Sequence, residues 1–288
     1  MRAGIPNWRD RLARGRERLE RAGIEEAPVK LRWVAAHLLE CGLLDVLRHL
    51  TEVPDSALAE RFESAVARLE TDEPVQYVIG ETDFMGLRIR CDPRALIPRP
   101  ETEELVACAE DFLRARPGPS AAVDVCTGTG CIACALAKRV PGVRVRATEL
   151  SAAALELARE NARALGADVE FLRADLLAGV PDDSVDLVVS NPPYVGSGEC
   201  ERLPRTVRDF EPRLALDGGP DGLRVISRLV EEAARVLTSG GRLMLEIGED
   251  QADAVAEILC RTTPFQNPTV KCDCAGRARV VLAQRAAR

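Results

Sequence analysis

From about residue 101 to the end of the chain, short apolar segments alternate with longer segments of helical periodicity. Apolar runs of strand length that alternate with helices are typical of parallel strands buried on both faces. We therefore predict an α/β fold, with a mostly parallel sheet and helices on both of its faces. The predicted strands are 121–126, 143–148, 169–173, 185–190, 242–247 and 280–283, and the predicted helices are 131–139, 152–165, 225–237 and 250–260.

The region before residue 99 follows other patterns and predicts two further parts. Residues 5–72 have helical periodicity, with one apolar face at Leu31, Val34, Ala35, Leu38 and Leu39 and another at Leu58, Phe62, Ala65, Val66 and Leu69. After them, Leu87, Ile89 and Cys91 alternate with charged residues, and Met85-Gly86 is a candidate hairpin turn to a partner strand at 75–79 or 82–84. We predict a helical domain at 1–74, a β-hairpin linker at 75–98 and the α/β domain at 99–288.

A glycine loop, Asp124-Val-Cys-Thr-Gly128-Thr-Gly130, joins the first predicted strand to its helix. Glycines let the backbone approach a ligand closely. Glu149 ends the next strand, where an acid can bind both hydroxyls of a ribose, and Asp175 follows the third strand and could bind an adenine amino group. A tight strand–helix turn is the alternative interpretation of the loop by itself. Because the full G-x-G-x-x-G is missing, an adenosine ligand is favoured over a dinucleotide.

A polar and rigid segment, Asn191-Pro192-Pro193-Tyr194, directly follows the apolar run at 185–190. Ligands bind at the carboxyl ends of strands in open α/β sheets. The two prolines have no N–H donors, so the Asn191 side-chain oxygen and the Pro192 carbonyl remain as acceptors. Two acceptors could hold an –NH2 group. The alternative is a rigid turn without chemistry, since Asn-Pro is a common turn former.

Composition and cysteine spacing argue against several other functions. The net charge is −7 and aromatic residues make up 3% of the chain, so a nucleic-acid-binding surface is not expected. No apolar stretch has the length of a membrane span, and no signal peptide is visible. The cysteines lie within apolar patterns, which predicts reduced thiols and a cytoplasmic protein. Cys126, Cys131 and Cys134, with Cys272-Asp-Cys274, have a spacing that an iron–sulfur protein could use; we predict no metal site.

These motifs together resemble the protein-(glutamine N5) methyltransferases that modify peptide-chain release factors. The resemblance covers nearly the whole chain and includes the helical first domain, Ile97–Glu103, the glycine loop, Asn191–Tyr194, Phe210–Gly219 and Glu246–Gln251. It implies a Rossmann-like fold of class I S-adenosylmethionine-dependent methyltransferases. It also implies transfer of a methyl group from S-adenosylmethionine to the glutamine of a Gly-Gly-Gln motif in a class I release factor.

The resemblance further implies roles for individual residues. Asn191, Pro192 and Tyr194 would be catalytic: the first two would orient the glutamine amide, and Tyr194 would face the sulfonium of the donor. The glutamine would contact Leu96, Asn191, Pro192, Pro193 and Tyr194. The residues implied to bind the donor are Arg99, Thr102, Asp124, Thr127, Gly128, Thr129, Gly130, Glu149, Leu150, Asp175, Leu176 and Asn191.

Two other methyl acceptors stay open at this point. Many family members have glycine where this chain has Cys126, and the cysteine also resembles sister enzymes that methylate a glutamine of a large-subunit ribosomal protein. Those sisters generally lack the Arg99-Pro-Glu-Thr-Glu103 run. Adenine-N6 DNA methyltransferases share the proline motif, but they need a basic target-recognition region. We expect a monomer whose helical domain recognises the release factor, with no direct contact to nucleic acid or membrane.

Overall fold

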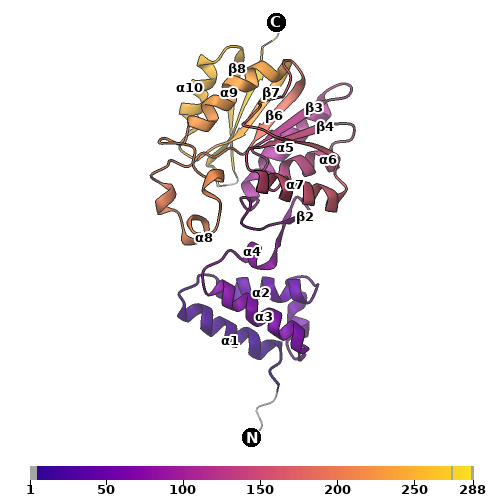
Figure 1. Ribbon diagram of the computed structural model, residues 1–288, viewed down its shortest axis with the longest axis vertical. Coiled ribbons are helices and arrows are strands. Elements are labelled where there is room, and N and C mark those ends of the chain that lie inside the picture. Colours follow the sequence, from indigo (N-terminus) through magenta and orange to yellow (C-terminus); the bar gives the residue numbers. More distant parts are fainter. Residues whose placement is uncertain (1–4, 274, 287–288) are drawn as a thin grey trace. The chain divides into compact units, whose positions relative to one another are not determined.

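The computed structural model describes residues 5–273 and 275–286, and the chain forms two compact units. The first unit comprises the residues up to Glu81 together with Pro204–Phe210, and the second comprises Thr82–Leu203 and Glu211 onward (Figure 1). Among the described residues, no helix combines the length and the apolar character that a membrane span needs.

The first unit is helical, as predicted. Its elements are α1 (Trp8–Arg21), α2 (Ala27–Leu38), the 3-10 helix η1 (Asp45–His49), α3 (Ser56–Leu69), α4 (Val75–Ile79) and the short α8 (Arg205–Arg208). The Asn7 side chain accepts from the backbone N–H of Asp10 and so starts α1 with a capping box. Trp8 meets Phe62 edge-on, with ring centroids 5.4 Å apart. Both rings are fully buried, so they anchor the packing of α1 against α3.

The predicted hairpin is present, with one of its two candidate partners. Strand β1 (Glu81–Phe84) pairs with β2 (Leu87–Arg90). Met85 and Gly86 both have positive φ, as a two-residue hairpin turn of type I′ requires. The other candidate strand, 75–79, is wrong because these residues form α4. Pro74 precedes this helix and Gly80, at φ 89°, ends it, and the helix buries Val75 and Tyr77.

A seven-stranded sheet forms the centre of the second unit, within the described residues. Its strand order is β5-β4-β3-β6-β7-β9-β8. The neighbours from β5 to β7 pair in parallel, whereas β9 runs antiparallel to both β7 and β8. The strands are β3 (Ala121–Val125), β4 (Arg144–Glu149), β5 (Val169–Arg173), β6 (Val185–Ser190), β7 (Leu237–Glu246), β8 (Phe265–Cys272) and β9 (Ala278–Arg285).

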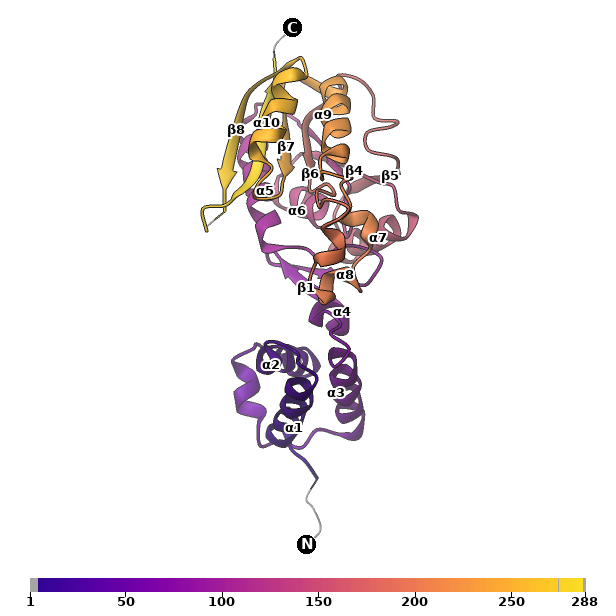
Figure 2. The ribbon, with the colours of Figure 1, turned by 90° about the vertical axis from the view of Figure 1, so that its left-hand side faces the viewer.

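Helices cover both faces of this sheet, as the alternating pattern predicted (Figure 2). One face packs against α5 (Pro100–Ala115), α6 (Cys131–Arg139) and α7 (Ala152–Leu165), and the other packs against α9 (Arg224–Val236) and α10 (Ala252–Arg261). Neighbouring residues of one strand face opposite layers: Leu187 and Val189 pack with α5 and α6, and Val188 packs with α9. The strand order changes direction between β3 and β6, which places a crevice at their carboxyl ends.

Strand β8 was not predicted from the sequence. It is the edge strand, and all of its residues except Phe265 and Pro268 are exposed. An exposed edge strand needs no alternating apolar pattern, since its place is fixed by the hydrogen bonds to β9.

Candidate active site at the carboxyl ends of β3, β4 and β6

A cavity of about 330 Å³ lies at this edge of the sheet, wholly within the second unit. Its volume is in the range of small-molecule sites. Twelve of the predicted site residues line it: Leu96, Arg99, Thr102, Thr127, Gly128, Thr129, Glu149, Leu150, Asp175, Leu176, Asn191 and Pro193. The other four predicted residues, Asp124, Gly130, Pro192 and Tyr194, lie next to this wall in sequence but are not part of it.

The glycine loop comes close to helix α7. Gly130 has a φ of 80°, and a Cβ placed on it would lie 3.0 Å from the Cβ of Ala158. Glycine is therefore required here for its positive φ and for the close packing of the loop on the helix. The loop is tied to the neighbouring strand because the Thr127 N–H donates to the Thr148 carbonyl, at 3.1 Å.

Glu149 is buried at the end of β4 and is held from two sides. Its Oε2 accepts from the Gly128 N–H at 3.0 Å, and its Oε1 accepts from the Ser151 N–H at 2.9 Å. Ser151 is the N-cap of α7, so the carboxylate is fixed between the glycine loop and the start of this helix. Each carboxylate oxygen keeps a second lone pair for a ligand hydroxyl.

Asp124 lies beneath the loop, fully buried. Its Oδ2 accepts from the Thr127 hydroxyl and from the Ala133 N–H. Burial raises the pKa of this carboxyl to about 7. Asp124 Oδ1 and Thr148 Oγ1 are buried polar atoms without a hydrogen-bond partner among the described residues. Orphaned polar atoms beside a cavity indicate a place for ligand or ordered water.

The structure pairs Asp175, which was predicted to bind an adenine amino group, with a basic residue that the sequence did not link to it. Arg228 donates to Asp175 Oδ2 at 2.9 Å, and both side chains are half exposed at the cavity wall. The neighbouring Cys126 also lines the cavity and has a φ of 59°, a left-handed conformation that favours glycine. This backbone geometry explains why a glycine at this position is compatible with the same loop.

Asn191 stands at the carboxyl end of β6, where a chain of hydrogen bonds holds its side chain. Its Nδ2 donates to Thr102 Oγ1 at 3.1 Å, and the Thr102 hydroxyl donates to Glu246 Oε2 at 2.6 Å. Thr102 and Glu246 are both buried. Tyr194 turns its hydroxyl to the same carboxylate, 3.4 Å from Glu246 Oε1, and its ring packs on the apolar layer below α9. Sequence reasoning placed Thr102 with the donor and gave Glu246 no role.

Residues 218–222, in the later part of the connection between β6 and α9, pack against the Asn191–Tyr194 backbone. A Cβ on Gly222 would lie 2.2 Å from the Tyr194 carbonyl oxygen, and one on Gly218 would lie 2.6 Å from the Pro193 carbonyl oxygen. The Gln251 side-chain amide also donates to the Tyr194 carbonyl, at 2.9 Å. The glycines are therefore needed for close approach, which explains two of the glycines near the Phe210–Gly219 run.

Glu211, from the same connection, ties down the opposite wall of the cavity. Its buried carboxylate accepts from the Ile97 N–H at 3.0 Å and from the Arg99 guanidinium. Burial raises the pKa of this carboxyl, and the charge of Arg99 opposes that rise. Sequence reasoning assigned no role to Glu211, although the residue lies within the Phe210–Gly219 run that carries the family resemblance.

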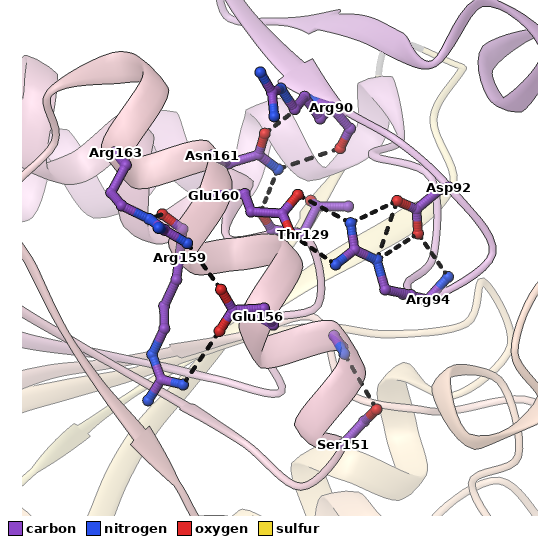
Figure 3. A network of polar contacts seen from close by, with 11 residues as sticks. Arg90, Asp92, Arg94, Thr129, Ser151, Glu156, Arg159, Glu160, Asn161 and Arg163 are labelled. Atoms are coloured by element: carbon purple, nitrogen blue, oxygen red, sulfur yellow. Dashed lines mark hydrogen bonds and ion pairs between the residues drawn. The ribbon is translucent and has the colours of Figure 1, made fainter.

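Helix α7 holds the segment that leads from the hairpin into the cavity (Figure 3). Asn161, fully buried, accepts from the Arg90 N–H and donates to the carbonyl oxygens of Arg90 and Thr129. Arg94 forms bidentate ion pairs with Asp92 and Glu160, with N–O distances of 2.7–3.1 Å. These contacts fix residues 94–97, which line the cavity, to α7 and to the glycine loop.

The cysteines near the loop have the properties of packed thiols. Cys131 and Cys134 are buried in α6, and burial raises the pKa of both thiols, to about 12 for Cys134. A metal ligand must be a thiolate, so these environments disfavour metal binding. The described residues contain no cluster of three or more His, Cys, Asp or Glu suited to a metal ion. Cys272 is exposed, and Cys274 lies outside the described residues.

Comparisons with known proteins identify two family models in this chain. Residues 10–80 match the family model of the PrmC N-terminal domain, and residues 110–207 match that of the methyltransferase small domain. A methyltransferase structure from Pyrococcus furiosus superposes with a TM-score of 0.53 at 19% identity, over 80% of this chain and 99% of that one; it supports the fold alone.

Two curated relatives have the same name, release factor glutamine methyltransferase. The protein from Moorella thermoacetica is 41% identical over 96% of this chain and 98% of its own length. The protein from Deinococcus radiodurans is also 41% identical, again over 96% of this chain and 98% of its own. Identity at this level over both units, together with the glycine loop and the Asn191 segment at one cavity, shows that this chain belongs to the release factor glutamine methyltransferase family.

Proposed function

We propose that this protein transfers a methyl group from S-adenosylmethionine to the side-chain amide nitrogen of the glutamine in the Gly-Gly-Gln motif of a class I release factor. One observation carries the proposal. The Asn191 side chain lies in the wall of the same cavity as the glycine loop and Glu149, and its amide is held by a buried hydroxyl. Family membership supports the same reaction.

The cavity wall has the groups that an adenosyl donor needs. Glu149 can accept from ribose hydroxyls, and Leu150 and Leu176 offer apolar surface beside it. Asp124 Oδ1 and Thr148 Oγ1, buried and unpartnered among the described residues, can satisfy the polar end of the donor directly or through water. When bound, S-adenosylmethionine supplies an electrophilic methyl group on a positively charged sulfur.

The residues around Asn191 can orient the methyl acceptor. A carboxamide nitrogen is a weak nucleophile because its lone pair is delocalised into the carbonyl. Asn191 Oδ1 and the Pro192 carbonyl can accept its two N–H groups, which would direct the nitrogen and raise its electron density. Alignment of two reactants in this way can lower a barrier by about 7–11 kcal/mol in well-oriented systems. We propose that Tyr194 supports this segment through Glu246.

The helical unit is proposed to recognise the body of the release factor. A Gly-Gly-Gln segment has only one side chain, so it offers few contacts for selectivity. The cavity residues all lie in the second unit, which leaves the surface of the first unit for a protein partner. The protein would then act in the cytoplasm, as a monomer.

The direct test is mass spectrometry of candidate acceptors. Purified class I release factors and the large-subunit ribosomal proteins of the same cell are incubated with the enzyme and S-adenosylmethionine. We expect a gain of one methyl group on the Gly-Gly-Gln glutamine. A ribosomal protein that gains the methyl group while the release factors do not would replace the proposed substrate.

The role of Asn191 is tested by Asn191→Ala. Alanine cannot accept the amide hydrogen, and loss of one preorganised polar group of this kind costs about 10²–10³ in rate. We expect single-turnover methylation to fall by this factor while calorimetry shows unchanged S-adenosylmethionine affinity. A rate within a few-fold of wild type would mean that Asn191–Tyr194 is only a turn.

A further inference from the structure

The direction of the Asn191 amide decides what the cavity can hold. Its Oδ1 accepts hydrogen bonds and its Nδ2 donates them, so the two orientations present opposite chemistry. The two atoms have nearly the same shape, and their assignment must come from the surrounding hydrogen bonds. A glutamine amide nitrogen requires Oδ1, whereas a glutamate carboxylate would prefer Nδ2.

The direction of the Asn191 amide follows from the number of protons that Thr102 and Glu246 can donate. An ionised Glu246 can only accept, so the single hydroxyl proton of Thr102 is used in the 2.6 Å bond to Glu246 Oε2. Toward Asn191, 3.1 Å away, Thr102 can then only accept. The Asn191 atom that faces Thr102 must therefore be Nδ2, and Oδ1 is presented on the opposite side of the amide.

These three residues come from different elements. Thr102 is in the first turn of α5, Asn191 follows β6, and Glu246 ends β7. Glu246 is 1% exposed and Thr102 is 2% exposed, so water does not compete for either hydrogen bond. A buried carboxylate is costly to the fold, which favours a functional reason for its presence beside the site.

We infer that Thr102 and Glu246 are positioning residues that hold Asn191 as an acceptor-only group and so make the site select a carboxamide over a carboxylate. The inference rests on the proposed function, in which Asn191 contacts the substrate amide. Both residues act through Asn191, without contact to the methyl group. A glutamate in place of the glutamine of the Gly-Gly-Gln motif has only acceptor oxygens. These oxygens would be repelled by Asn191 Oδ1 and the Pro192 carbonyl, which are also acceptors.

The test begins with Thr102→Val, which keeps the side-chain shape and removes the hydroxyl. We expect single-turnover methylation of the whole release factor, at saturating donor, to fall by about 10²-fold, as misplacement of a reacting group does. Donor affinity should change by less than about threefold, and Thr102→Ser should restore the rate. Thr238→Val is the matched control, because Thr238 also donates to a carboxylate, Asp186, at the start of the same strand β7; its rate should stay at the wild-type value.

A double variant shows whether Thr102 acts through Asn191. Adding Thr102→Val to Asn191→Ala should cause no further loss of rate, since the group that Thr102 holds is already absent. A peptide with glutamate in place of the glutamine should inhibit Thr102→Val more strongly than wild type, because the amide can then turn its Nδ2 toward the carboxylate. If circular dichroism shows that Thr102→Val is unfolded, Thr102→Cys replaces it, because a thiol is a weaker hydrogen-bonding group than a hydroxyl. The methylation rate of Thr102→Cys should also fall.

Failure of this inference differs from failure of the proposed function. If Asn191→Ala loses activity but Thr102→Val does not, or if the two losses are additive, the positioning role is wrong and the function stands. Unchanged inhibition by the glutamate peptide in Thr102→Val would also overturn the acceptor-only role. If Asn191→Ala itself stays within a few-fold of wild type, the proposed function loses its basis.

Discussion

At the scale of the residue, the burial of Glu246 is costly to stability and is explained by its proposed positioning role. Burial raises the pKa of its carboxyl from about 4.5 to about 6, and Glu101 adds to this rise. The folded state therefore binds this proton more tightly than the unfolded state. The contribution of the protonated Glu246 carboxyl to stability is fully present below about pH 4.5 and is lost as the pH rises through about 6. At neutral pH the ionised group is destabilising, by roughly 2 kcal/mol at about 1.4 kcal/mol per pKa unit.

Replacement of this carboxylate by a neutral side chain of the same shape should therefore stabilise the fold. We expect Glu246→Gln to raise the free energy of unfolding at pH 8 by about 1–2 kcal/mol, and to have little effect at pH 4. Urea unfolding at both pH values measures the difference. A variant that is less stable than wild type at pH 8 would show that the charge of Glu246 stabilises its surroundings.

At the scale of the element, the Asn191–Tyr194 segment depends on a later part of the same β6–α9 connection, which passes directly against it. A Cβ at Gly222 would come within 2.2 Å of the Tyr194 carbonyl oxygen, and Gly222 has a φ of 73°. Gly222→Ala should lower the free energy of unfolding by about 1–2 kcal/mol because of the left-handed backbone, and by a further ~1–3 kcal/mol because of overpacking. The variant should also slow methylation, because the added methyl group would push away the Asn191–Tyr194 segment.

Gly142 provides the control for this prediction. It has a φ of 78° but open space where its Cβ would lie. Gly142→Ala should therefore show only the backbone cost and normal methylation. Chemical denaturation and single-turnover kinetics of both variants separate the two effects, and equal losses in both would argue against the close approach at Tyr194.

At the scale of the whole molecule, the two units divide the proposed work. Every described residue that lines the cavity belongs to the second unit. A chain that begins at Thr82 should bind S-adenosylmethionine with an affinity within about threefold of the full chain, yet fail to methylate the intact release factor. Isothermal calorimetry and mass spectrometry measure these two properties. Undiminished methylation of the whole factor would refute the recognition role of the helical unit, provided that circular dichroism shows a folded truncated chain.

The sequence predicted those elements whose pattern is local. The predicted bounds are confirmed for helices 131–139 and 152–165 and for strands 169–173 and 185–190. The reason is that apolar periodicity and neighbouring glycine or serine residues are local features of the sequence. The carboxyl ends of these strands then had to meet at one edge of a parallel sheet. The sequence therefore predicts the glycine loop, Glu149 and Asn191 at one edge of the sheet, and residues 127–129, Glu149 and Asn191 line one cavity.

Only the tertiary structure decided which distant side chains meet there. Thr102 and Glu246 are 144 positions apart, and their hydrogen bond exists because α5 packs across the ends of β6 and β7. The pairing of Asp175 with Arg228 has the same origin in the packing of α9. Periodicity determines which face of an element is buried, but the partner of a buried polar group is set by the order of the strands and by how the helices pack on them. Asn191 could thus be proposed as a site residue from the sequence, whereas its hydrogen-bonded partnership with Thr102 and Glu246 could not.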